Sequence, residues 1–194
     1  MTVRIPIIPT IIVGGAIAVM IALGFWQLGR MGEKEALVAQ AEENLQMSAA
    51  VAYPLEAGQF DQVMYRRTTI DCLEVLSVSP RAGTSSKGAK GWAQRASCTL
   101  QGVDAPVDVD IGWSVRPEAA SWQGGEVSGI IAPGGRVVAT EPLAGLETLA
   151  TPDPRDLPNN HLAYAGQWFF FALTALVIYI LALRRRPATK ARDD

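Results

Sequence analysis

Residues 158–171 read Pro-Asn-Asn-His-Leu-Ala-Tyr-Ala-Gly-Gln-Trp-Phe-Phe-Phe, and they include His161, the only histidine of the 194-residue chain. From Leu162 to Leu183 the sequence carries no charged side chain. At a rise of about 1.5 Å per residue, this segment is long enough to cross a hydrocarbon core of roughly 30 Å. We therefore predict a transmembrane helix over residues 161–183, with the histidine at its start.

A second uncharged stretch, Ile5 to Leu28, lies near the other end of the chain and is also long enough to span a bilayer. A cleaved signal peptide is disfavoured because its apolar region is usually about 7–15 residues long. We predict a transmembrane helix over residues 5–28. Residues 33–45 are rich in Glu, Ala, Leu and Gln, which favour continuation as a juxtamembrane helix.

Basic residues predict the orientation of both spans. The end of the chain carries Arg184, Arg185, Arg186, Lys190 and Arg192. Clusters of basic residues next to a span usually remain in the cytoplasm. Arg30 and Lys34 beside the first span have the opposite effect, but the larger cluster at the end of the chain outweighs them. We expect residues 1–4 and 184–194 to be cytoplasmic tails. Residues 29–160 would then be extracytoplasmic, which means periplasmic for a protein of a bacterial inner membrane.

The middle of the chain changes to a two-residue period that is typical of half-buried strands. The alternation is clearest over 92–100 and 107–113, and weaker candidates are 65–76, 126–132 and 136–140. Residues 81–91 are rich in Gly, Ser and Lys and predict an exposed loop. Asp108 and Asp110 alternate with apolar residues, so we expect both on an exposed face. The predicted fold class is a membrane protein in which two transmembrane helices flank a small antiparallel β-rich (α+β) extracytoplasmic domain.

Cys72 and Cys98 are the only cysteines, and we expect them on neighbouring strands. In an oxidising compartment they can form a structural disulfide, and two free buried cysteines are an equally good interpretation. They do not form a C-x-x-C motif, so a thioredoxin-like role is disfavoured. The net charge of −2 gives no global basic field, and we expect no nucleic-acid partner.

Helical spacing places His161 at the head of a seam of small and aromatic residues: Ala165, Trp168, Ala172, Ala175, Tyr179 and Ala182. Small residues line surfaces where membrane helices pack. One interpretation is that the seam packs against the first span and His161 caps it. The other is a niche, walled by Tyr164 and Trp168, that holds a planar apolar ligand.

Trp26 and Arg30 end the first span at the depth where His161 begins the second. An aromatic belt residue and a snorkelling charge explain Trp26 and Arg30 taken singly. Taken together with His161, they also suit haem, because imidazole ligates iron and arginine pairs with a carboxylate. The first span further carries Gly14, Ala18 and Ala22, a ridge that allows close approach of a helix.

Motifs along most of the chain resemble those of the Surfeit locus protein 1 family. The second span begins Asn159-Asn160-His161-Leu162-x-Tyr164-Ala165-x-x-Trp168-Phe169, which is similar to that family's second-helix signature. The first span ends Gly24-Phe25-Trp26-Gln27-Leu28-x-Arg30, with Lys34 following, which resembles its first-helix signature. Weaker landmarks are Tyr65-Arg66-Arg67 and Gly112-Trp113 with Pro117.

The resemblance implies an assembly factor for haem–copper oxidases, chiefly cytochrome c oxidase, that inserts or retains haem a in the catalytic subunit, subunit I. It implies His161 as the haem-iron ligand, haem a as a transient cargo, and haem a synthase as a possible donor, in contact with membrane lipid. A structural assembly factor that binds no haem is the alternative. An enzyme is disfavoured because one histidine leaves acid–base schemes short of groups. One departure is Ile111, which stands where the family commonly has arginine before Gly-Trp.

Overall fold

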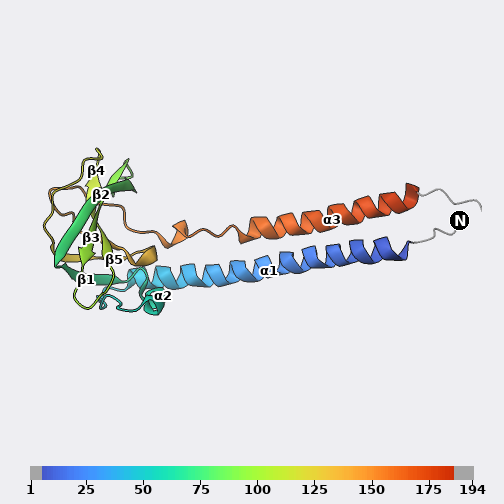
Figure 1. Ribbon diagram of the computed structural model, residues 1–194, viewed down its shortest axis with the longest axis horizontal. Helices are drawn as coiled ribbons and strands as arrows, with labels where there is room; N and C mark the ends of the chain where they lie inside the picture. Colours follow the sequence, from blue (N-terminus) through green and yellow to red (C-terminus); the bar gives the residue numbers. More distant parts are fainter. Residues whose placement is uncertain (1–5, 186–194) are drawn as a thin grey trace, which may run out of the picture. The chain divides into compact units, whose positions relative to one another are not determined.

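The chain folds into two long helices, α1 and α3, and one six-stranded sheet (Figure 1). The computed structural model describes residues 6–185. Its contacts divide the chain into a membrane unit, made of residues up to 37 and from 158 onward, and a sheet unit, residues 38–157. The predicted tail over residues 1–4 lies outside the described residues, as does the predicted basic tail beyond Arg185.

Both predicted spans are helical. Helix α1 covers Ile7–Gln46 and helix α3 covers His161–Arg185. Each contains a stretch long and apolar enough to cross a membrane. Large apolar side chains on both helices are left uncovered by protein, as Ile8 on α1 (72% exposed) and Ile178 on α3 (61% exposed) illustrate. Apolar surface of this extent needs lipid around it, so the chain is a membrane protein with two spanning helices.

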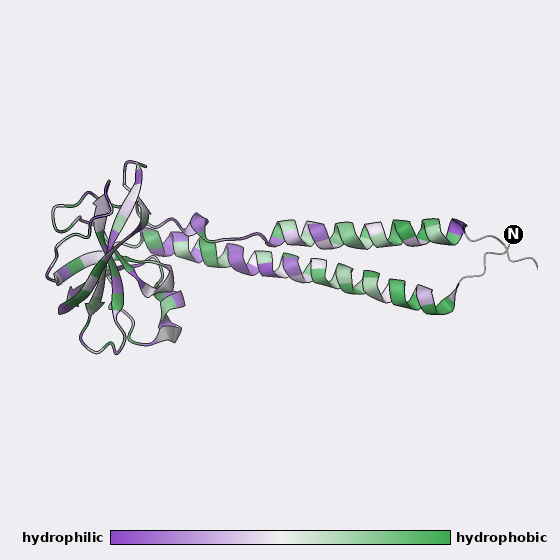
Figure 2. Cartoon of the chain, turned by 45° about the horizontal axis from the view of Figure 1, so that its top comes forward, coloured by the Kyte–Doolittle hydropathy of each residue, from purple (hydrophilic) through white to green (hydrophobic). Residues whose placement is uncertain are grey.

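Helix α1 continues without interruption past the predicted span into the polar stretch over residues 33–45. Figure 2 shows this change as green giving way to purple along α1. The predicted continuation of the first helix beyond the apolar segment is therefore present. Helix α3 has Arg184 and Arg185 in its last turn, where positive charge complements the helix dipole.

Two polar contacts, one toward each end of the apolar segments, join α1 and α3. The hydroxyl groups of Thr10 and Tyr179 hydrogen-bond to each other. At the other end, the side-chain oxygen of Gln27 contacts the His161 ring. Thr10, early in α1, thus meets Tyr179, late in α3, whereas Gln27, further along α1, meets His161 at the start of α3. The two helices therefore run antiparallel.

The seam predicted on α3 faces α1. Its members Ala165 and Ala172 are the two buried residues of the helix, at 1% and 5% exposure. Opposite them, Gly24 lies so close to the Phe169 ring that a Cβ atom on the glycine would stand 2.5 Å from a ring carbon. The ring of Phe25 meets Phe169 edge-on at 5.4 Å. The helix-packing interpretation of the seam is therefore correct over these residues.

The ridge of small residues predicted on α1 does not contribute to this packing. Gly14, Ala18 and Ala22 are all exposed, and a Cβ atom built on Gly14 would have no neighbour within 4 Å. The face of α1 toward α3 instead carries Gly24 and Gln27. Side-chain size alone did not identify the contact face, because the polar and aromatic partners on α3 set the rotation of α1.

The sheet unit is built from strands β1 (Arg67–Cys72), β2 (Glu74–Thr84), β3 (Lys90–Thr99), β4 (Val107–Ser114), β5 (Gly125–Ile131) and β6 (Val137–Ala139). The strand order is β1-β5-β6-β4-β3-β2. Short helical turns lie at α2 (Phe60–Val63), η1 (Ala57–Gln59), η2 (Pro133–Gly135) and η3 (Pro154–Asp156). The sheet is mixed, because β4 and β6 pair in parallel while the other pairs are antiparallel. The predicted β-rich domain is present, and four of its five strand pairs are antiparallel as expected, whereas the pairing of β4 with β6 is parallel.

Strands β1 and β2 occupy opposite edges of the sheet, yet only Leu73 separates them in the chain. The sheet must therefore curl until its two edges meet at this corner. The Leu73 amide donates to the Thr99 carbonyl of β3 at 3.0 Å and helps to close the corner. The sequence predicted a weakly patterned strand over residues 65–76, and the structure divides this segment at Leu73 into β1 and the start of β2.

Cys72 and Cys98 form a disulfide at this corner, with their Cα atoms 5.3 Å apart. The sequence predicted that the two cysteines lie on neighbouring strands. They do not, because β5, β6 and β4 stand between β1 and β3 in the sheet. The curl of the sheet brings their ends together. The disulfide lies in the main hydrophobic core, where Ala96, Val109 and Ile111 are fully buried.

The predicted loop over residues 81–91 is shorter than expected. Strand β2 continues to Thr84 and β3 begins at Lys90, so only residues 85–89 connect them. The pairing runs out to Thr84 opposite Lys90. Gly83 and Gly91 face each other in this ladder, and a Cβ on Gly91 would clash with the Trp113 side chain. The glycines that suggested a loop are required here by close packing of strands.

Candidate functional site

His161 is the first residue of α3 and follows the sequence Pro158-Asn159-Asn160. The Tyr164 amide donates to the Asn160 carbonyl at 3.2 Å, which closes the first helical turn. The imidazole is half-buried. Its Nδ1 atom lies 2.7 Å from Oε1 of Gln27. Among the described residues, this is the one hydrogen bond of the ring, so Nε2 is left without a protein partner.

The other four predicted site residues are partly or largely exposed. Trp26 and Tyr164 are 56% and 51% exposed, and the Arg30 side chain is 47% exposed. Trp168 is half-buried and meets the Phe171 ring edge-on, with ring centres 6.4 Å apart. Within residues 6–185, no hydrogen bond, ion pair or ring contact joins any two of the five predicted residues.

Helical phase nevertheless brings these side chains to one flank of the helix pair. With Gln27 facing His161, Arg30 lies about 60° around α1, and Tyr164 lies about 60° around α3 in the same rotational sense. In antiparallel helices, equal rotations lead to the same side. Trp26 lies further round on this flank, and Trp168 lies about 20° from His161. We call this surface the aromatic flank, comprising Trp26, Arg30, Tyr164 and Trp168 beside His161.

Depth in the membrane unit agrees with this grouping. Trp26 and Arg30 are within one helical turn of Gln27, and Tyr164 is within one turn of His161. The Gln27–His161 contact sets both turns at one level. The structure therefore gathers an imidazole nitrogen, aromatic side chains and a guanidinium group along one side of two helices.

Arg30 is already paired with a carboxylate. Its guanidinium contacts Glu33 one turn further along α1, and the two side chains are 47% and 61% exposed. Exposed pairs of this kind contribute about 0–1 kcal/mol. The Arg30 guanidinium can therefore exchange Glu33 for a stronger anionic partner at little cost.

Gln27 is the site residue to which sequence reasoning assigned no role. It appeared only as part of the first-helix motif. The available signal was its position at the end of the first span, level with the start of the second. An uncharged amide in that place has to find a hydrogen-bond partner, and His161 was expected at the same depth on the second span.

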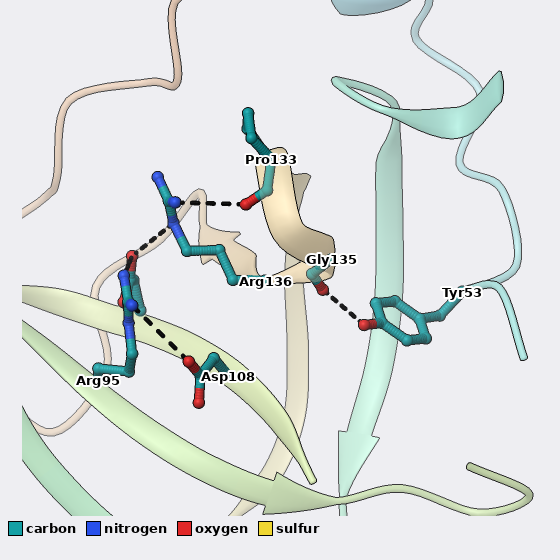
Figure 3. A network of polar contacts seen from close by, with 7 residues as sticks. Tyr53, Arg95, Asp108, Pro133, Gly135 and Arg136 are labelled. Atoms are coloured by element: carbon teal, nitrogen blue, oxygen red, sulfur yellow. Dashed lines mark hydrogen bonds and ion pairs between the residues drawn. The ribbon is translucent and has the colours of Figure 1, made fainter. Parts of the chain in front are cut away.

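A second polar cluster lies in the sheet unit and is shown in Figure 3. Arg95 donates from Nε and Nη2 to the two carboxylate oxygens of Asp110, at 2.7 and 3.0 Å. Arg136 Nε lies 3.1 Å from the same carboxylate, and Asp108 lies 3.7 Å from Arg95. The Asp110 side chain is 6% exposed, whereas Asp108 is 49% exposed. The prediction that both aspartates are exposed was therefore wrong for Asp110, whose charge is balanced by two arginines.

Tyr53 lies at the edge of this cluster. Its hydroxyl group donates to the Gly135 carbonyl at 2.5 Å (Figure 3). Burial, with a contribution from the charge of Asp108, raises the pKa of Tyr53 to about 12. The hydrogen bond with Asp110 raises the pKa of Arg95, so that guanidinium stays charged. The ion pairs join β3 and β4 to Arg136, which directly precedes β6, so we assign this cluster a structural role.

Ile111 stands directly before Gly112-Trp113 on β4. It is fully buried in the main core, next to Val109 on the same strand. Arg95 and Arg136 provide the guanidinium groups of the nearby polar cluster. An apolar residue is therefore well accommodated at position 111.

Two cavities open on the sheet unit. One of about 430 Å³ is lined by the last turn of α1 and residues 151–155, and the other, about 320 Å³, reaches from Leu45 across Ile130 and Val138 to Leu149. Neither is lined by any of the five predicted site residues. No group of three or more His, Cys, Asp or Glu side chains in residues 6–185 is placed to hold a metal ion. At His161, with Nδ1 in contact with Gln27, Nε2 is the nitrogen that can act as a donor to a metal.

A comparison with known protein families covers both the membrane unit and the sheet unit. The model of the SURF1 family matches residues 15–173, which include the Gln27–His161 contact, the aromatic flank and the entire sheet unit. A comparison with curated proteins gives no significant match. The chain belongs to the SURF1 family, and the resemblance predicted from its two helix motifs is confirmed. This is a family of cytochrome oxidase assembly factors and not of enzymes.

Proposed function

We propose that this cytochrome oxidase assembly factor acts as a haem a chaperone that delivers haem to the catalytic subunit of a haem–copper oxidase or helps to retain it there. The observation that carries the proposal is the state of the His161 ring. One nitrogen is hydrogen-bonded to Gln27, and the other has no protein partner among the described residues. An imidazole held in this way is suited to ligate iron.

The aromatic flank supplies the remaining contacts that this cargo needs. Trp26, Tyr164 and Trp168 would lie against the apolar macrocycle, and Arg30 would exchange Glu33 for a propionate carboxylate. Haem, if bound here, would supply an iron centre that His161 would hold. A single protein ligand and a largely exposed flank favour modest affinity, which suits a cargo that has to be released.

The proposed location follows from the same features. We place the protein in a bacterial inner membrane, with both termini in the cytoplasm and the sheet unit in the periplasm. The Cys72–Cys98 disulfide supports this side for the sheet unit, because such bonds persist in oxidising compartments. Oxidase subunit I and haem a synthase are the proposed protein partners, and lipid surrounds both helices. A reporter active only outside the cytoplasm, inserted in the exposed turn at residues 86–88, should be active in this topology.

The proposal is tested by the absorption spectrum of the full-length protein purified from a host that makes haem a. The wild type should carry a haem Soret band, and both His161→Ala and His161→Gln should lose most of it. The glutamine variant retains a polar side chain opposite Gln27 but supplies no imidazole. Tyr179→Phe is the matched control, because it breaks the Thr10 contact at the far end of the helix pair and should leave the band in place. A wild-type protein that carries no haem contradicts the proposal.

The alternative is a structural assembly factor that steadies oxidase subunits without touching haem. Its support is that the α3 seam is used for packing on α1, as buried Ala165 and Ala172 show. The two functions differ in their response to His161→Gln. A scaffold should tolerate this change with full oxidase activity and haem content, whereas a haem chaperone should lose oxidase assembly.

A further inference from the structure

We infer that Gln27 is the positioning residue of the site: its amide oxygen holds His161 in the Nδ1–H tautomer and so keeps the lone pair on Nε2. The consequence for iron ligation rests on the proposed haem role. The tautomer itself does not, and it can be measured on protein that carries no haem. The inference assigns a specific task to a residue that is remote in sequence, 134 positions before His161.

The chemistry of the contact determines the tautomer. A neutral imidazole has one N–H donor and one acceptor nitrogen, and an amide oxygen can only accept. With Gln27 Oε1 at 2.7 Å from Nδ1, the shared proton belongs to Nδ1. Nε2 then carries the lone pair that a metal requires. In the opposite orientation, the NH₂ group of the amide would donate to Nδ1. The imidazole proton would then sit on Nε2, and Nε2 could not ligate a metal.

The fold holds Gln27 where this control is effective. Its side chain is half-buried on the face of α1 toward α3. One turn earlier on α1, Gly24 packs directly against the Phe169 ring, which fixes the separation of the helices close to the contact. Metal-binding histidines usually donate their second N–H to such an acceptor, which orients the ring and raises its basicity.

A second amide, that of Asn159, does not share this task. Asn159 precedes His161 by two residues, and its Oδ1 atom is buried without a hydrogen-bond partner. It therefore does not accept from the imidazole. Gln27 is the acceptor that the described residues provide, and Asn159 offers a matched control of the same chemistry.

The first test uses ¹⁵N-histidine NMR on the full-length protein in detergent, without haem, at a pH where imidazole is neutral. Because His161 is the only histidine, the spectrum reports one residue. The wild type, Gln27→Glu and Asn159→Leu should show a protonated Nδ1 and an unprotonated Nε2. Gln27→Leu, which lacks an acceptor, should shift the population toward Nε2–H. A wild-type spectrum dominated by Nε2–H, or one that Gln27→Leu leaves unchanged, overturns the inference.

The second test titrates haem into the same four proteins and follows the Soret band. Loss of such a supporting partner typically weakens metal binding about 10–100-fold. We expect this loss for Gln27→Leu, while Gln27→Glu and Asn159→Leu should bind as the wild type does. Far-ultraviolet circular dichroism checks that the helices are retained. Gln27→Leu binding haem as tightly as the wild type overturns the positioning role, whereas absence of binding in the wild type refutes the proposed function and leaves the tautomer result to stand separately.

Discussion

Replacing Asp110 by Asn should destabilise the sheet unit strongly. The carboxylate accepts hydrogen bonds of 2.7 and 3.0 Å from Arg95, forms an ion pair with Arg136 at 3.1 Å, and is 6% exposed. Removing one partner of a buried ion pair typically costs about 3–5 kcal/mol, because the remaining charge is left without compensation. Arg95 and Arg136 are 23% and 34% exposed, so water offsets part of this cost. We therefore expect a loss near the lower limit, about 3 kcal/mol.

Thermal unfolding of the full-length protein in detergent, followed by near-ultraviolet circular dichroism with the disulfide intact, measures this loss. For a domain of this size, 1 kcal/mol corresponds to about 3–5 °C, so the midpoint should fall by roughly 10–15 °C. The matched control is Asp108→Asn, whose side chain is 49% exposed and 3.7 Å from Arg95. It should cost about 0.2–1 kcal/mol. Equal shifts for the two variants would refute the reasoning that burial of Asp110 makes the difference.

Replacing both Cys72 and Cys98 by Ser should lower the free energy of unfolding by about 3–4 kcal/mol, because the disulfide closes a loop across a sequence separation of 26. The free energy of unfolding of the wild type, measured with and without reductant, gives the same comparison. The neutral form of Tyr53 stabilises the fold fully below pH 10, and this contribution should be lost between pH 10 and 12, since burial raises the pKa to about 12. The urea midpoint of the wild type should therefore be lower at pH 11 than at pH 9, and this difference should be smaller in Tyr53→Phe. Gly24→Leu should cost about 1–3 kcal/mol by overpacking against Phe169, whereas Gly14→Leu should be neutral, as thermal midpoints in detergent would show.

The extent of both membrane helices and the position of His161 were accessible from sequence, because absence of charge over more than twenty residues is a local property. The seam on α3 was also predictable, since helical period fixes which residues share a face. The contact face of α1 was not. Gly14, Ala18 and Ala22 form a regular ridge but point away from α3, while Gly24 and Gln27 face it. Rotation of a helix about its axis depends on its partner.

Strands β3 and β4 were predicted because their side chains alternate between core and surface. The corner between β1 and β2 was not predicted, because no glycine or proline marks Leu73 and the change of strand partner there depends on the rest of the sheet. The parallel pairing of β4 with β6 and the burial of Asp110 could not be predicted either, and for one shared reason. Both depend on residues around position 137 reaching β4 from a distant part of the chain.

The sequence by itself determined the family, the two apolar helices, the β-rich middle and the presence of a single imidazole at a membrane boundary. These follow from composition, period and motif, which need no knowledge of neighbours. Only the tertiary structure showed that the sheet curls to join Cys72 and Cys98, and that Gln27 contacts His161. A hydrogen bond or a disulfide between distant residues depends on how helices rotate and strands order, and this is decided by packing of the whole chain.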